Sequence, residues 1–412
     1  MILNYIWVAF FLIAFVVAVV KLIFFQDMQV FPNMLQSTFD MAKTGFEISI
    51  ALTGVMTLWL GLMKIGERGG MVAILSRFVG PFFARLFPEV PKNHPATGSM
   101  ILNFSANMLG LDNAATPLGL KAMKELQELN PDKETASNAQ IMFLVLNASG
   151  LTIIPLSVIA DRATLGAANP TSIFIPTLIA TFCSTVAGLL YVSLRQKINL
   201  FDPVIIAYLL GFTGFVGMGV WYFASLTPTE LQQQSTLFTS VTILTIITLF
   251  MVLGILKRIS IFETFIEGAK EGFEISIKII PFLVAILVGI GLFRASGALD
   301  YFNQGVKWTL GQADINTDFV DALPVAYLKP LSGQAARGMM IEISKNNPGG
   351  PDGFVANLAA VFRGCAETTF YILALYFGSV NIRKTRYALT GGLIADLSGF
   401  IAAIFIGYLF FH

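Results

Sequence analysis

Six polar side chains within a short stretch of an otherwise apolar chain are of types and spacing suited to ligand binding. They are Asn103, Ser105, Asn107, Asp112, Asn113 and Thr116. Gly110, Pro117 and Gly119 interrupt the same stretch, so one continuous helix over it is not expected. Inside a bilayer, the backbone groups freed by such a break must be satisfied by protein or by a watery cavity. An intramembrane Asp beside several amides therefore predicts a binding site for a polar solute or an ion.

A second concentration of polar groups is Glu367, Thr368 and Thr369. A carboxylate in an apolar segment is costly unless it is paired or hydrated, so Glu367 is a candidate for a site or for ion coupling. The alternative is a structural ion pair with Arg363, which stands one helical turn earlier. Lys329 and Arg337 could equally neutralise Glu367.

Purely structural roles stay open for the first cluster as well. Asp112 or Asn113 could cap a helix that resumes near Ala114. Asn103 and Asn107 share a helical face, and an interhelical hydrogen bond there would contribute only about 1 kcal/mol.

The chain repeats itself. Residues 42–50 (AKTGFEISI) recur at 269–277 (AKEGFEISI) with one difference, and the same offset places Gly70 on Gly297. Such duplication is frequent in transporters. It relates 328–340 to the opening cluster and 147–154 to 364–371. The matching segments add six candidates to the site, namely Asn147, Ser149, Thr152, Ser332, Gln334 and Arg337.

The elements that position these residues are expected to be membrane helices. The 412 residues are 55% hydrophobic and 12% charged, about half the charge of a soluble protein. Apolar runs long enough to span lie at about 2–25, 171–194, 203–225, 236–256 and 387–411. More polar or interrupted membrane segments lie at about 96–126, 136–160, 318–345 and 353–380.

Two further regions, about 45–87 and 272–308, each have two apolar arms around a glycine-containing turn. Each arm pair is either a re-entrant hairpin or two crossings. Amphipathic segments at about 33–44 and 259–271 precede them and suit the membrane interface. Glu47 and Glu274, at the start of each first arm, fit interfacial ion pairs or caps better than ligands.

Lysine and arginine placement favours a cytoplasmic N-terminus and an inverted second half, because 203–225 adds one crossing between the halves. On that topology the internal loops hold Lys121, Lys124, Lys133, Arg195, Lys197, Lys257, Arg258, Arg383, Lys384 and Arg386. The external loops and helix ends, hairpins aside, hold Lys21, Arg162 and Lys345. The first hairpin argues against it, since Lys64, Arg68, Arg77 and Arg85 would lie outside.

Several classes of protein are disfavoured. The net charge of +1 offers no basic footprint for nucleic acid. Cys183 and Cys365 have no disulfide or zinc-site spacing, and no nucleotide-binding loop or catalytic motif is present. We expect neither an enzyme nor a bound cofactor or metal.

At this point the residues resemble a known family. Asn107–Met123 resembles the signature of spore maturation protein A. Pro330–Gly333, Glu367–Gly378 and Arg383–Arg386 resemble spore maturation protein B. The likeness covers nearly the whole chain, which resembles a natural fusion of the two, although Gln334–Arg337 departs from the smaller residues of that family.

Both proteins belong to the group with a nucleoside-recognition, or gate, domain, which includes concentrative nucleoside transporters and ferrous-iron transporters. The resemblance implies that hairpins and broken helices enclose a substrate near the bilayer midplane. A sporulation role is not implied, since fused forms occur in bacteria that do not sporulate.

The predicted fold is therefore an all-α polytopic membrane protein of two inverted-topology repeats. Each repeat has an interfacial helix, a re-entrant hairpin and broken transmembrane helices, related to concentrative nucleoside transporter-like folds. The expected parts are a first repeat (1–200), a linking helix (201–230) and a second repeat (231–412).

The predicted function is a permease for a small polar solute in the bacterial cytoplasmic (inner) membrane, with H⁺ or Na⁺ as candidate coupling ions. The alternatives are a non-transporting scaffold or assembly factor and a metal-ion permease. The expected partners are the lipid bilayer and the solute, not nucleic acid; a homo-oligomer stays open.

Overall fold

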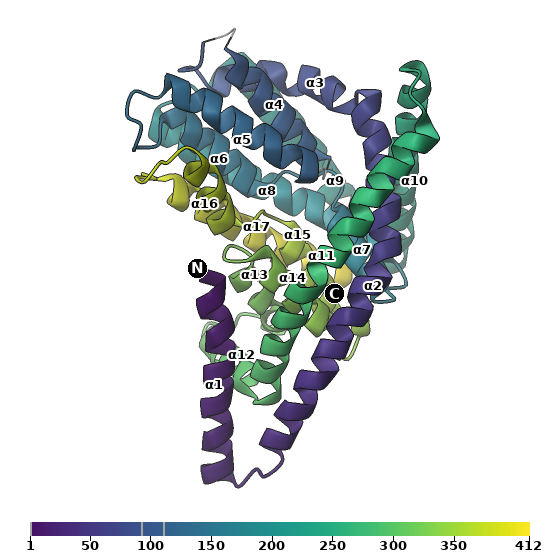
Figure 1. Ribbon diagram of the computed structural model, residues 1–412, viewed down its shortest axis with the longest axis vertical. Coiled ribbons are helices and arrows are strands. Elements are labelled where there is room, and N and C mark those ends of the chain that lie inside the picture. Colours follow the sequence, from purple (N-terminus) through teal and green to yellow (C-terminus); the bar gives the residue numbers. More distant parts are fainter. Residues whose placement is uncertain (1, 92–93, 110–111) are drawn as a thin grey trace.

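The computed structural model describes residues 2–91, 94–109 and 112–412, and helices make up nearly all of this part (Figure 1). No strand occurs within it, only an isolated bridge between Thr135 and Lys384. The α-helices are α1 (Ile2–Phe25), α2 (Val30–Gly69), α3 (Met71–Leu86), α4 (Pro95–Met108), α5 (Asp112–Leu129), α6 (Asn138–Ser149), α7 (Leu156–Thr164), α8 (Phe174–Gln196), α9 (Pro203–Ala224), α10 (Pro228–Leu256), α11 (Ile261–Ala295), α12 (Ala298–Gly311), α13 (Leu323–Leu328), α14 (Gly333–Asn346), α15 (Phe354–Gly364), α16 (Thr369–Ser379) and α17 (Ala388–Phe411).

Seven stretches of the described chain are long and apolar enough to cross a membrane, or eight if the bent pair α11–α12 counts as one span. The five predicted apolar runs correspond to α1, α8, α9, α10 and α17, which confirms them. The all-helical, multi-pass membrane class is therefore confirmed.

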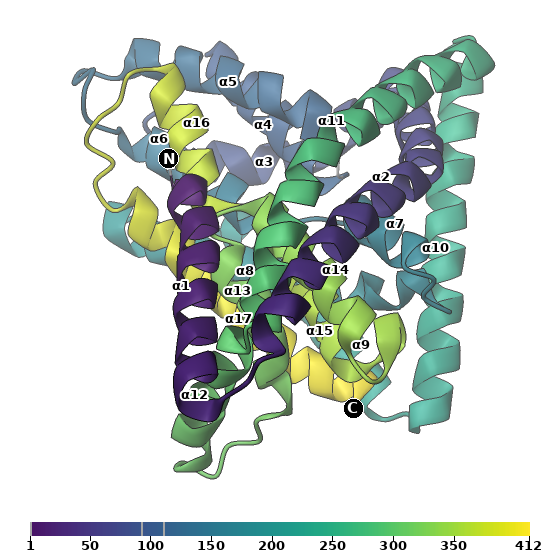
Figure 2. The ribbon, with the colours of Figure 1, turned by 60° about the horizontal axis from the view of Figure 1, so that its bottom comes forward.

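Two very long helices, α2 and α11, cross the molecule side by side and run antiparallel (Figure 2). Glycines allow the close approach, since a Cβ at Gly272 would lie 2.7 Å from the Met56 carbonyl oxygen and 2.9 Å from Thr57 Cα. A Cβ at Gly45 would similarly lie 3.0 Å from Val284 Cα. Dispersion contacts between closely packed backbones are the main attraction between helices in lipid, where the hydrophobic effect is weak.

The two arm pairs expected at 45–87 and 272–308 are α2–α3 and α11–α12. α2 is unbroken over its 40 residues up to Gly69, and α11 and α12 bend by 67°, as in a broken span or a re-entrant loop. The turns do fall at the predicted glycines, since Gly70 and Gly297 have φ values of 91° and 84°.

The amphipathic segments 33–44 and 259–271 do not form interfacial helices separate from the apolar helices that follow them. They form the first turns of α2 and α11, because no strong helix breaker divides them from the apolar residues that follow. At about 1.5 Å per residue α2 reaches about 60 Å, twice the thickness of the hydrocarbon layer. Glu47 has the structural role expected of it, an exposed pair with Lys43 at 3.7 Å.

The chain also folds back at the polar segments. α4 ends at Met108, and α5, which begins at Asp112, packs along it, with Asn103 Nδ2 donating to the Ala115 carbonyl oxygen at 2.8 Å. The short α13 likewise packs against α14 across residues 329–332. The predicted interruption after Asn103 is thus confirmed between Met108 and Asp112, whereas α5 continues through Pro117 and Gly119, where a break was also expected.

Two further interrupted helices are α6–α7 and α15–α16, of which α6 and α15 pack against both α8 and α17, and α16 packs against α17 (Figure 1). Glycines again permit contact, since a Cβ at Gly188 of α8 would lie 3.1 Å from Ala395 of α17. Arg162 of α7, counted above among external charges, is 1% exposed and donates to the backbone oxygens of Asn169, Pro170 and Pro351. It therefore carries no information on orientation.

Candidate functional site

Backbone hydrogen bonds join the helix interruptions to one another. Glu367 N, between α15 and α16, donates to the Ala148 carbonyl oxygen near the end of α6 at 2.9 Å. Ile153 N, between α6 and α7, donates to the Met108 carbonyl oxygen at 2.7 Å. The interruptions of α4–α5, α6–α7 and α15–α16 therefore meet in one place.

The fourth interruption reaches the same place. Phe370 N, in the first turn of α16, donates to the Pro330 carbonyl oxygen between α13 and α14 at 3.0 Å. A Cβ on Gly333 would lie 2.8 Å from Thr368 Oγ1, so the start of α14 touches the start of α16. We call the region where the four interruptions meet the crossing region.

Gly150 shows how tightly the crossing region is packed. Its φ of 57° is left-handed, and a Cβ on it would lie 2.9 Å from Glu367 Cγ. Only glycine meets both conditions without strain, because a side chain here would be disfavoured by the backbone conformation and would collide with Glu367.

A chain of amides and one phenol lines the first part of the crossing region. Asn107 Nδ2 donates to Asn147 Oδ1 at 2.8 Å, and the Tyr376 hydroxyl donates to the same oxygen at 3.5 Å. Asn103 Nδ2 also reaches the Tyr376 oxygen, at 3.4 Å. Since Asn103 and Asn147 are 0% and 1% exposed, three predicted residues are brought together in the interior.

Charged groups occupy the part of the crossing region around the start of α16. Asp396 of α17 is 1% exposed, and its Oδ2 accepts a 2.7 Å hydrogen bond from the Thr369 hydroxyl. Lys329, between α13 and α14, is 7% exposed and, with Glu367, acts electrostatically on Asp396. A lysine and two carboxylates from three segments thus surround the start of α16.

A separate buried ion cluster lies beside the crossing region. Asp161 of α7 is fully buried and receives Arg337 Nε at 3.0 Å on both carboxylate oxygens and Arg337 Nη2 at 2.5 Å on one of them. Arg363 Nη2 lies 3.4 Å from the same carboxylate. The predicted ligand Arg337 is therefore engaged by Asp161, and Arg363, weighed as a partner of Glu367, binds Asp161 as well.

Comparisons with known proteins identify the family of this chain. A family model described as "Gate: Nucleoside recognition" matches residues 49–163. Spore maturation protein A of Bacillus subtilis (strain 168) is 39% identical over 197 residues, which cover 47% of this chain and 97% of that protein. The chain belongs to the spore maturation protein A and B family.

Spore maturation protein B of the same organism is 44% identical over 158 residues, covering 38% of this chain and 86% of that protein. No solved structure matches. The resemblance drawn from the signature residues is thus confirmed, and this spore maturation family member resembles both proteins in one chain.

The remaining predicted residues have local roles. Thr152 Oγ1 donates to the Gly150 carbonyl oxygen, Ser149 Oγ to that of Leu146, and Ser332 Oγ caps α14 by accepting from Ala335 N. Ser105 lies 3.2 Å from the Ser76 hydroxyl. Gln334 Oε1 is buried without a hydrogen-bond partner in the part of the chain that is described, and Thr116 is half-buried. The side chains of Asp112 and Asn113 lie outside the described residues.

Four residues of this spore maturation family member were not among the predicted ligands, namely Asp161, Lys329, Tyr376 and Asp396. Lys329 was considered only as a partner for Glu367. The sequence signal for Asp396 is a charge in an apolar segment, since it is the only charged residue in 388–411. The average hydropathy of that helix concealed it.

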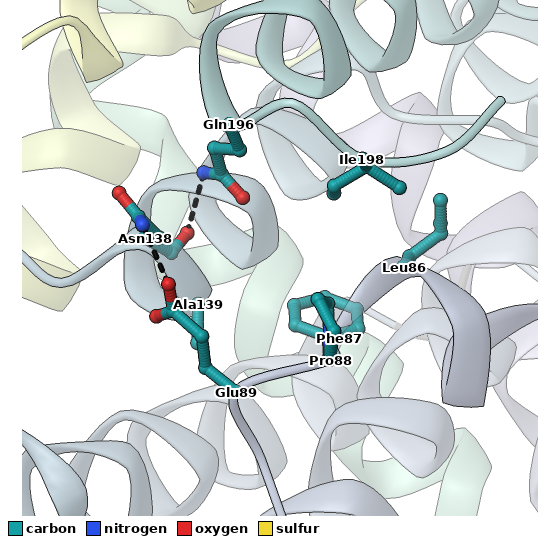
Figure 3. Close-up of a pocket in the computed structure, with 8 residues that line it drawn as sticks. All are labelled: Leu86, Phe87, Pro88, Glu89, Asn138, Ala139, Gln196 and Ile198. Atoms are coloured by element: carbon teal, nitrogen blue, oxygen red, sulfur yellow. Dashed lines mark hydrogen bonds between the residues drawn. The ribbon is translucent and has the colours of Figure 1, made fainter.

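The pocket in Figure 3 is not a solute site. It has a volume of about 20 Å³, lies where the end of α3 meets the start of α6 and the end of α8, and leaves room for about one water molecule. Asn138 bridges it, donating to Glu89 Oε1 at 2.6 Å and accepting from Gln196 Nε2 at 2.8 Å. Within the described ranges, no group of three or more His, Cys, Asp or Glu could hold a metal ion.

Proposed function

We propose that this spore maturation family member is a permease for a small polar solute, which binds in the crossing region. The observation that carries the proposal is the meeting of four helix interruptions around buried Asn, Lys and Asp side chains and the half-buried Glu367. Broken helices at membrane depth are tolerated where they line a cavity or a protein interior, and in transporters they surround the substrate.

An inverted repeat is the architecture we propose for it. Gly45 meets Val284 across α2 and α11, and Gly272 meets Thr57, which are equivalent pairs at the offset of the repeated nonapeptide. An antiparallel pair of repeated helices is what a two-fold axis in the membrane plane generates. The first repeat (1–200) and the second repeat (231–412), joined by the linking helix (201–230), would then meet in the crossing region, as in concentrative nucleoside transporter-like folds.

The chemistry of the proposed lining indicates the solute class. Asn107, Asn147, Thr368 and Glu367 offer donors and acceptors but no extended apolar surface, which suits a small polar solute and disfavours a long lipid. Transport by coupling to H⁺ or Na⁺ needs no catalytic residue, and we place the protein in a bacterial cytoplasmic membrane.

A thermal-stability screen of purified protein tests the proposal. Nucleosides, carboxylates and divalent cations are the probes, and a solute that binds the folded state raises the melting temperature with its concentration. Glu367→Gln should abolish the rise while the protein stays folded. Glu47→Gln makes the same chemical change in an exposed pair and should keep it.

Uptake into vesicles by the wild-type protein, lost in Glu367→Gln and kept in Glu47→Gln, would complete the argument. A wild-type protein that no probe stabilises and that moves none of them would favour the scaffold reading. Selective stabilisation by divalent cations would favour the metal-ion permease.

A further inference from the structure

Asp396 lies on a face of α17 that is lined by two glycines. Gly392, Asp396 and Gly399 recur at the spacing that places residues on one face of a helix. That face of α17 lies against the interruption of α15–α16, since a Cβ on Gly392 would lie 2.6 Å from Thr369 Cγ2 and one on Gly399 would lie 3.1 Å from the Cys365 carbonyl oxygen. The two glycines let α17 approach so closely that the carboxyl group meets the start of α16.

The carboxyl group is poorly solvated for a charged group. Asp396 is 1% exposed and accepts one hydrogen bond, from Thr369, at Oδ2. Its other oxygen, Oδ1, is buried without a hydrogen-bond partner among the described residues. A buried carboxylate needs several donors or a close counter-ion to stay charged, so binding a proton relieves this cost.

The charged and titratable neighbours select a proton over a metal cation. Lys329, between α13 and α14, and Glu367, between α15 and α16, act electrostatically on Asp396, and the Cys365 thiol is buried near it. On α8, the residue that packs against Gly399 of the same face is Ser184, which is uncharged. The ammonium group of Lys329 would repel a metal cation bound at Asp396. A proton instead neutralises the Asp396 carboxylate without adding a separate ion.

We propose that Asp396 is the proton-binding site of this protein and that Lys329 links its protonation to solute binding. Only the link between proton binding and solute binding rests on the proposed permease function. When Asp396 is ionised, it attracts the ammonium group of Lys329. When it is protonated, that attraction is lost and Lys329 can interact with an acceptor on the solute, so proton and solute binding are linked thermodynamically.

A pH titration of the full-length protein in lipid nanodiscs, followed by infrared difference spectroscopy of carboxyl groups, tests the site with the proton as the only probe. Asp396→Asn should abolish one carboxylic-acid component, and the amide can still accept the Thr369 hydrogen bond. Glu342→Gln is the matched control, because it removes a buried carboxylate that pairs with Arg294 and should leave that component in place.

Two further variants have effects of opposite sign. Lys329→Met removes a positive charge that favours the ionised form, so the midpoint of the Asp396 component should move to higher pH. Glu367→Gln removes a negative charge, so the midpoint should move to lower pH. An Asp396 that takes up no proton over the titrated pH range would give neither shift.

The outcomes separate the two proposals. Persistence of every carboxylic-acid component in Asp396→Asn, or a midpoint unmoved in both Lys329→Met and Glu367→Gln, would overturn the proton site. Because the titration contains no solute, its result does not depend on whether the permease proposal holds. If Asp396→Asn fails to fold, Thr369→Val supplies the test, since loss of that donor should also raise the midpoint.

Discussion

Removing the charge of Asp161 should destabilise the protein severely. Its carboxylate is fully buried, is held by Arg337 through three contacts of 2.5–3.0 Å, and is also approached by Arg363 at 3.4 Å. Asp161→Asn takes away the carboxylate that holds the buried Arg337 guanidinium and removes a negative charge beside Arg363. Loss of one partner from a buried ion pair costs about 3–5 kcal/mol, which is a change of about two to four orders of magnitude in the unfolding equilibrium.

Unfolding in mixed micelles with increasing SDS, followed by tryptophan fluorescence, measures this cost. The exposed pair of Glu134 and Arg383, 3.9 Å apart with side chains 61% and 80% exposed, supplies the control. Glu134→Gln should cost less than about 1 kcal/mol, because solvent screens an exposed pair.

Variants within the cluster should also follow an order. Arg337→Met should cost less than Asp161→Asn, because Asp161 keeps Arg363 as a counter-ion. The reasoning is refuted if Asp161→Asn unfolds within about 1 kcal/mol of the wild type, or if Arg337→Met is the more damaging change.

Three further changes have defined outcomes. Gly272→Leu should lower the free energy of unfolding by about 1–3 kcal/mol, because its side chain would enter the space of the Met56 carbonyl, whereas Gly54→Leu, with nothing within 4 Å, should be tolerated; thermal melts compare them. Gly150→Ala should cost about 1–2 kcal/mol for the left-handed backbone alone and should also reduce solute binding, measured as lost ligand-induced stabilisation. Tyr376→Phe removes a hydroxyl that contacts two buried amides and should cost about 1 kcal/mol by the same melts, and an unchanged melting temperature would contradict that contribution.

Length, hydropathy and punctuation were enough to predict the apolar spans, the interruption after Asn103 and the turns at Gly70 and Gly297. These features mispredicted the helix boundaries where an amphipathic pattern runs directly into an apolar one. An amphipathic stretch followed by an apolar one reads as two elements, but without a breaker between them the backbone continues, as in α2. The repeat likewise shows which segments correspond to one another. It does not show that α5 folds back along α4, because tertiary packing between the two helices decides this.

The partners of the buried charges are the least predictable part of the candidate site. Arg337 and Asp161 are 176 positions apart, and nothing local in either segment indicates the other. The nearby alternative, Arg363 with Glu367, was attractive because helical spacing is visible in a sequence. Tertiary contact took Arg363 to Asp161 instead, so the local pairing rule was overridden by a more deeply buried carboxylate.

The hydrogen bond from Glu367 N to the Ala148 carbonyl has a consequence for how this protein must be assembled. One backbone partner precedes α9 in the chain and the other follows it, so a polypeptide severed at the loop before α9 would leave neither fragment with a complete crossing region. The intact chain acts as a tether that raises the effective concentration of each half near the other. Fragments produced separately would have to supply that concentration themselves, and co-expressing them would measure how much of the assembly free energy the covalent connection provides.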